Sequence, residues 1–296
     1  MADGKYDILD IISSIRESID IESAVKQLQY SYEVILSHYC SKMKSSKSKQ
    51  ILMLRDNISP RYWNCVNIHN SLKEQILWMS INPSGAKKDK SGNYIQEDNN
   101  CRFNLNWNPE EQDKYWKTLI SNIGTGQLNK CGHLDILPIH LSREKEVWHS
   151  FFKDTTTIEF QMVVDLVMST QTLLEKIKPK LIIYSNVSTK WLWGIEDSGW
   201  MGYILEPVEE YFGENQSAID SINELRKSIN GYWHSNPGKG LFRIKGITDG
   251  NISHLNVTNL DGYLLLDYQV ANYHWKDSAL QPGDVNRVWK TISSLE

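Results

Sequence analysis

The sequence has few cysteines, and their spacing does not suit a metal site. Its four cysteines, Cys40, Cys65, Cys101 and Cys131, lie far apart, and no Cys-x-x-Cys pair occurs. Structural zinc and iron–sulfur sites are commonly built from such pairs. We therefore expect isolated reduced thiols, with no metal and no other cofactor.

Long hydrophobic runs are also missing. No stretch approaches the ~18 consecutive apolar residues that a membrane-spanning helix requires. Residues 1–7 are acidic and lead into an amphipathic pattern, whereas a signal peptide would continue into an apolar core. These features predict a cytoplasmic protein that does not engage a membrane.

Positive charge is not in excess. The chain has 32 Lys and Arg against 36 Asp and Glu, a net charge of −4, which is not typical of a strongly basic nucleic-acid binder. A local patch can still supply phosphate contacts. Lysines cluster at residues 42–49, which resembles a solvated linker, and again at residues 87–90. A glycine-rich phosphate loop is absent, which argues against a nucleotide hydrolase.

Apolar periodicity predicts helices in the first part of the chain. Ile8, Ile12, Ile15 and Ile19 mark one face of a helix over residues 6–19, and a similar pattern covers residues 23–43. A Lys- and Ser-rich segment follows. We interpret residues 1–75 as a helical N-terminal extension and residues 76–296 as an α/β domain.

Strands and helices are predicted to alternate in that domain. Strands are expected at residues 75–81, 133–137, 181–184 and 263–266. Helices are expected from the N-cap Asn108, from a capping box at residues 156–159 to Pro179, near Gly194, and after Pro282. This alternation predicts a three-layer αβα fold with a central four-stranded parallel sheet. Residues 195–262, with a helix near 218–229 and a strand near 241–247, are read as an insertion.

Polar turns follow the predicted strands. Asn82-Pro83-Ser84-Gly85 ends the first strand, and the later tips fall at Pro138, at Ser185 and Asn186, and at residues 267–275. The carboxyl ends of parallel strands meet at one edge, where α/β proteins bind ligands. Asn, Pro, Ser and Gly are also common in ordinary turns, so the motif alone fits both a simple turn and a ligand-binding site.

Several of these landmarks resemble the uracil-DNA glycosylase superfamily, in particular its mismatch-specific and thymine-DNA glycosylase branches. Residues 81–85 resemble the Ile-Asn-Pro-Gly motif, and residues 113–119 resemble its Asn-Arg-Phe-Trp-x-x-Leu helix. Residues 134–138 and 178–184, with Trp191 to Gly194, resemble its second and third strand regions. The resemblance covers residues 76–194 and 263–296. The final His-Pro-Ser or Asn-Pro-Ser motif is missing, and the insertion has no counterpart in the small members.

The resemblance implies base flipping followed by hydrolysis of a glycosidic bond. Asn82 matches the catalytic position, where an amide orients water toward an oxocarbenium-like sugar. Asp135 falls where the family reads uracil with Asn. An ionised carboxylate only accepts hydrogen bonds, so it suits cytosine N4 better than uracil O4. Asp135 fits a turn cap or a lysine pair equally well. Ser84 and Gly85 are small and leave room for a 5-substituent.

The remaining candidates are assigned by position. Phe103 is a candidate for stacking on the base and His140 for contacting it, although both also fit core packing. The candidate DNA contacts are Lys87, Lys88, Arg143, Ser185, Asn186, Gln269, Asn272, Tyr273 and His274. The last two could also fill the gap left by a flipped base, or pack in the core.

We therefore expect a DNA glycosylase that acts on a modified pyrimidine and leaves an abasic site. It is expected to be monofunctional, because no lysine at the motif tip could form a Schiff base. A 5-substituted cytosine is favoured, such as glucosylated hydroxymethylcytosine in phage DNA, which implies antiviral defence. The expected partner is double-stranded DNA, with no obligate protein partner. The alternative is an inactive glycosylase fold that binds nucleic acid or protein.

Overall fold

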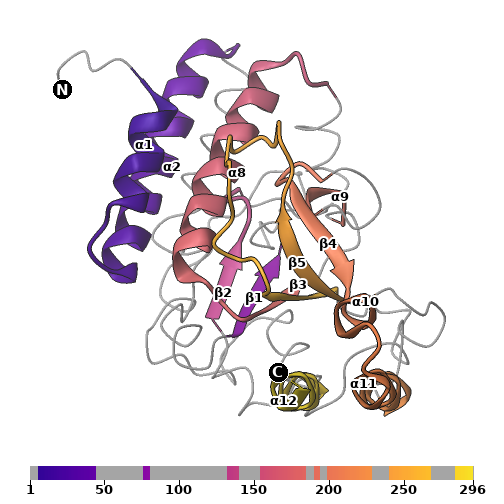
Figure 1. Ribbon diagram of the computed structural model, residues 1–296. Helices are drawn as coiled ribbons and strands as arrows, with labels where there is room; N and C mark the ends of the chain where they lie inside the picture. Colours follow the sequence, from indigo (N-terminus) through magenta and orange to yellow (C-terminus); the bar gives the residue numbers. More distant parts are fainter. Residues whose placement is uncertain are drawn as a thin grey trace, which may run out of the picture.

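Helices and strands follow one another along the chain in a computed structural model of the protein (Figure 1). The structure describes residues 6–44, 76–80, 132–139, 154–184, 190–193, 199–228, 240–267 and 284–295. The helices are α1 (Ile8–Arg16), α2 (Ile21–Lys42), α8 (Ile158–Ile177), α9 (Lys190–Trp193), α10 (Val208–Phe212), α11 (Gln216–Ser228) and α12 (Asp284–Leu295). The strands are β1 (Ile76–Ser80), β2 (Gly132–Asp135), β3 (Leu181–Tyr184), β4 (Tyr203–Pro207), β5 (Leu241–Ile247) and β6 (Leu264–Asp267). The expected mixture of helix and strand is confirmed.

The strands form one six-stranded sheet in the order β2-β1-β3-β6-β5-β4. β1 pairs in parallel with β2 and β3, and β3 pairs in parallel with β6. β5 runs antiparallel to both β6 and β4. The four strands expected from the sequence are thus present, but the sheet is larger than the predicted four strands. The additional strands both come from residues 195–262, which were expected to form an insertion.

β4 and α10 were missed from the sequence. β4 is an edge strand in which only Tyr203 is buried, and it lacks the apolar alternation that marks a half-buried strand. It also ends in Pro207, which is tolerated at an edge. Just before β4, Gly202 has a φ of +78°, and a Cβ there would collide with Asn251. The segment is therefore held by non-local contacts that its local pattern does not reveal.

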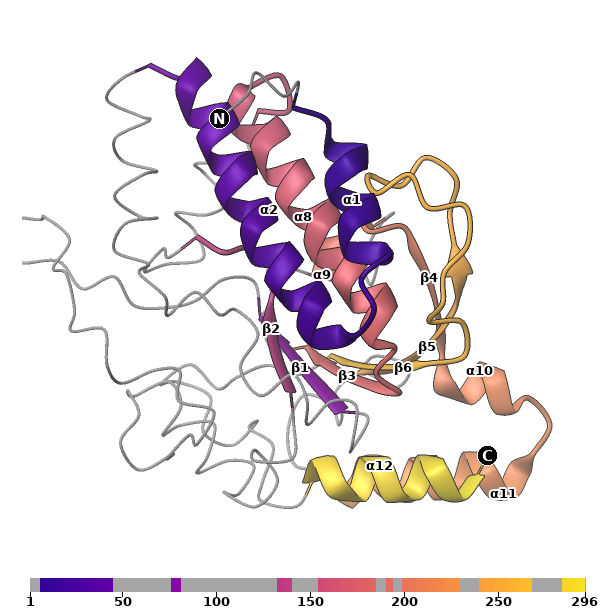
Figure 2. The ribbon, with the colours of Figure 1, turned by 90° about the vertical axis from the view of Figure 1, so that its left-hand side faces the viewer.

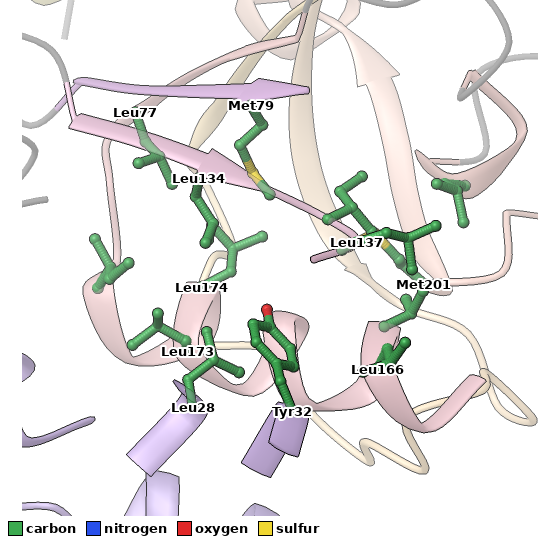
Figure 3. Packing of buried hydrophobic residues seen from close by; sticks show 14 of the residues in the cluster. Leu28, Tyr32, Leu77, Met79, Leu134, Leu137, Leu166, Leu173, Leu174 and Met201 are labelled. Atoms are coloured by element: carbon green, nitrogen blue, oxygen red, sulfur yellow. The ribbon is translucent and has the colours of Figure 1, made fainter. Parts of the chain in front are cut away.

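α8 is the central helix of the fold. Its N-cap is Thr157, whose side chain accepts from Phe160 N at 3.1 Å, and its C-cap is Lys178, with a φ of +54°. From Met162 onward nearly every residue is buried. A helix that is buried on all sides must pack on more than one layer. In Figure 3, Leu173 and Leu174 lie between strand residues Leu77 and Leu134 and residue Leu28 of α2.

The N-terminal helices belong to the same core as the sheet. α1 and α2 lie beside α8 on one side of the sheet (Figure 1). Leu28, Tyr32 and Ile35 are buried in one continuous apolar cluster with Leu77 and Met79 of β1. Ile19 was expected on the buried face of the first helix, but this is wrong, because α1 ends at Arg16 and Ile19 is 96% exposed.

α11 and α12 lie on the other side of the sheet from α8 (Figure 2). Val288 and Ile292 of α12 are buried. Trp78 and Ile183 are buried too, and strand alternation directs them away from α8. Among the helices that the structure describes, none combines the length and apolar content needed to cross a bilayer.

Candidate functional site

The direction in which the chain crosses the sheet reverses at β1. β2 follows β1 in sequence and pairs on one side of it, whereas β3 pairs on the other side and β6 lies beyond β3. In open α/β sheets such a reversal opens a crevice outside the carboxyl ends of the two strands that flank it, and ligands bind there. The candidate site therefore lies at the ends of β1 and β3, with β2 beside them.

The carboxyl ends of the parallel strands are closely aligned. Ser80 is paired with Asp135, Met79 with Tyr184, and Tyr184 with Asp267. Ile136 N also donates to Ser80 O at 2.9 Å, which extends the pairing of β1 and β2 by one residue. This alignment agrees with the expectation that the strand tips meet at one edge.

Ser80 and Asp135 present their side chains to the same face of the sheet. Met79 and Leu134, the residues that precede them, point toward α8 (Figure 3). Successive strand residues alternate, so Ser80 and Asp135 lie on the opposite face. Each is only 4% exposed. A hydroxyl and a carboxyl group therefore lie side by side in a buried position at the end of the sheet.

Burial raises the pKa of Asp135 well above its ordinary value. A neutral carboxyl group both donates and accepts hydrogen bonds. It can donate to cytosine N3 while accepting from N4, and it can equally accept from uracil N3 while donating to O4. The preference for cytosine over uracil, which assumed an ionised carboxylate, stays a prediction, because the neutral form of this group can pair with either base. The choice of base must depend on other contacts.

A buried chain of hydrogen bonds supports the turn after Asp135. Thr170 Oγ1 of α8 donates to Ile136 O at 2.8 Å, and Tyr32 Oη of α2 lies 2.6 Å from Thr170 Oγ1. Because the single threonine hydroxyl proton goes to a carbonyl, Tyr32 is the donor to Thr170. The sequence pattern places Tyr32 and Thr170 on apolar helix faces and predicts no other role for them. Their hydroxyl groups, within otherwise apolar helix faces, are the feature that could have indicated a hydrogen-bonding role.

Of the site residues predicted from the sequence, the structure describes Asp135. Asn82 lies two residues beyond Ser80 in the chain, and Ser185 and Asn186 directly follow Tyr184, but all three are outside the described residues. So are Ser84, Gly85, Lys87, Lys88, Phe103, His140, Arg143, Gln269, Asn272, Tyr273 and His274. Within the described ranges, no group of three or more His, Cys, Asp or Glu is placed to hold a metal ion. Comparisons with protein-family models, curated proteins and solved structures find no match.

Proposed function

We propose that this protein is a monofunctional DNA glycosylase that hydrolyses the glycosidic bond of a modified pyrimidine in double-stranded DNA. The observation that carries the proposal is the buried carboxyl group of Asp135, which lies next to the end of β1 at the reversal of the sheet. The motif that resembles the glycosylase family begins one residue after Ser80. The proposed architecture is three-layered, with β2, β1, β3 and β6 as the central parallel strands.

In the proposed reaction, the target nucleotide is flipped out of the duplex into the crevice. The neutral Asp135 binds the base edge by donating one hydrogen bond and accepting another. The C1′–N1 bond breaks, and its electron pair leaves with the base. A water molecule oriented by the amide of Asn82 adds to C1′ and returns a proton to the base. The products are the free base and an abasic site.

The proposed substrate is a 5-substituted cytosine, such as the glucosylated hydroxymethylcytosine of phage DNA. With this substrate, the protein would be a cytoplasmic antiviral enzyme. Ser84 and Gly85 support this choice because small residues after Asn82 leave space beside the 5-position. The neutral form of the Asp135 side chain can pair with cytosine, but Asp135 alone does not select cytosine over uracil.

The test is base release from duplex oligonucleotides that contain uracil, a thymine mismatch, hydroxymethylcytosine or its glucosylated form. Alkali cleavage at abasic sites reports the product. We expect release from a modified cytosine, and a rate at least roughly 100-fold lower in Asn82→Ala, the range typical for losing one preorganised polar group. Asp135→Asn, which still donates and accepts, should retain more activity than Asp135→Ala.

The matched control is Asp249→Asn, an exposed carboxylate outside the strand ends, which should react like the wild type. The absence of base release from every substrate would refute the proposal. DNA binding without release, equal in wild type and Asn82→Ala, would identify a binding module.

A further inference from the structure

A cavity lies at the carboxyl end of α8, just before the chain enters β3. It has a volume of about 580 Å³ and is lined by the end of α1, the last turn of α8 and residues 254–259. α8 leads directly from this cavity into the amino end of β3, whereas the candidate glycosylase site lies at the carboxyl ends of the strands. The two places are thus separated by the length of the strands.

The lining of this cavity carries more positive than negative charge. It includes Arg16, Lys176 and Lys178, against the single carboxylate of Glu175. The carboxyl ends of α1 and α8 each add roughly −0.5 charge. Within the lining, three positive charges therefore face a negative total of roughly −2. Asp20 lies outside the lining, and its carboxylate accepts from Ser23 N at 2.7 Å and also interacts with Lys176. The positive charge left for a ligand is therefore that of Arg16 and Lys178.

Glu175 accepts hydrogen bonds from three donors of the protein. It is 5% exposed, and it accepts from Tyr203 Oη at 2.8 Å, Thr258 Oγ1 at 2.7 Å and Asn259 N at 2.6 Å. These donors come from β4 and from the loop that forms one wall of the cavity. The carboxylate thus holds that wall in place, and its charge is already compensated by three donors.

The cationic wall is also built by defined contacts. Lys176 Nζ donates to Arg16 O at 2.9 Å and so joins the end of α1 to α8. Lys178 caps α8 in the left-handed conformation, which turns the chain into β3. Because one contact joins these two helix ends, Arg16 and Lys178 are brought to the same cavity from distant parts of the sequence.

The loop wall is ordered by Asn251. Its Nδ2 donates to Thr248 O at 2.9 Å and to Leu255 O at 2.8 Å, and its Oδ1 accepts from Leu255 N at 3.0 Å. This loop presents His254, Asn256 and Val257 to the cavity, and Val257 is 78% exposed. The cavity therefore combines cations, amides and one exposed apolar side chain.

We propose that this cavity binds a small phosphate-bearing ligand, with Arg16 and Lys178 contacting the phosphate groups. Arginine forms paired hydrogen bonds with phosphate oxygens, and lysine supplies a compact charge. The volume falls within the range of about 300–1,000 Å³ typical of small-molecule sites. The amides and Val257 suit a planar, partly apolar group attached to the phosphates, as in a nucleotide. The inference is independent of the glycosylase proposal.

Isothermal titration with pyrophosphate and with adenosine triphosphate tests this proposal without requiring any enzymatic activity. We expect one molecule bound per chain, and roughly tenfold weaker binding in the double variant Arg16→Gln/Lys178→Gln, because each lost exposed charge pair contributes up to ~1 kcal/mol. The charge-conserving variant Arg16→Lys/Lys178→Arg should retain most of the affinity. Tighter binding of the nucleotide than of pyrophosphate would assign the ligand as a nucleotide, and equal binding would assign the phosphate groups alone.

The matched control is Lys227→Gln/Lys290→Gln, which removes two exposed lysines from α11 and α12 and should bind like the wild type. Circular dichroism checks that each variant is folded. The proposal is overturned if neither probe binds at millimolar concentration, if Arg16→Gln/Lys178→Gln binds normally, or if the control loses affinity equally.

Discussion

At the residue scale, Asp135 links stability to pH. Its side chain is buried, and desolvation raises its pKa in the folded protein above the ordinary value of 3.8. The folded state therefore retains a proton that the unfolded state loses. The free energy of unfolding should fall as pH rises from about 4 toward the raised pKa, because ionising a buried carboxyl group is costly.

This linkage predicts the effect of Asp135→Asn. The amide does not titrate, so the variant should lose less stability than the wild type between pH 4.5 and pH 8.5. Each pKa unit by which burial raises the pKa of this carboxyl group corresponds to ~1.4 kcal/mol, so the two stability curves should diverge steadily as pH rises. Urea unfolding across this range measures it, with Asp249→Asn as an exposed control. Parallel stability curves for wild type and Asp135→Asn would contradict the prediction.

At the element scale, α8 connects the N-terminal helices to the candidate site. Its Asp165 accepts hydrogen bonds from Tyr6 of the segment before α1 and, at 2.7 Å, from Tyr39 of α2. Its Thr170 joins Tyr32 of α2 to Ile136, the residue after Asp135. α2 therefore contributes to the support of the β2 turn although it lies far from it in sequence.

Tyr32→Phe tests that support. The substitution keeps the buried ring but removes the hydroxyl that donates to Thr170, and it should lower the free energy of unfolding by about 1 kcal/mol. The matched control is Tyr30→Phe, because Tyr30 is 66% exposed and its loss should have little effect. Urea unfolding of both variants gives the comparison. Equal stabilities would show that the Tyr32 hydroxyl contributes nothing to the fold.

At the scale of the whole molecule, the N-terminal helices and the sheet share one core. Leu28 of α2 is fully buried, and the apolar cluster to which it belongs continues to Leu77 of β1. Elements that share a core are expected to unfold together. Leu28→Ala should therefore destabilise the entire protein, by about 2–5 kcal/mol for a buried leucine.

Two probes distinguish shared from separate unfolding. Far-ultraviolet circular dichroism follows all helices, including α1 and α2, and tryptophan fluorescence includes Trp78 and Trp193, which are buried near the sheet. Both midpoints should fall equally in Leu28→Ala, whereas Leu9→Ala, at an exposed leucine, should change neither. A fluorescence midpoint that stays constant while the circular dichroism midpoint falls would show an N-terminal extension that unfolds independently.

The sequence by itself determined most helices and strands, because their signals are local. Apolar spacing located α2 and α8, the threonine pair before Ile158 marked the start of α8, and short apolar runs marked β1 and β3. It also placed a polar residue, Asp135, within the second strand, which in the structure ends at that residue. Apolar periodicity wrongly placed Ile19 in the first helix, because α1 ends earlier. It also missed β4, because an edge strand needs little apolar alternation.

Only the tertiary structure decided the strand order, the position of the reversal at β1, and the inclusion of α1 and α2 in the core of the sheet. It also decided that Asp135 is buried and that Arg16 lies near Lys178. These properties arise from contacts between residues far apart in the chain. Desolvation and the balance of charge depend on what surrounds a side chain in space, and no local pattern records that.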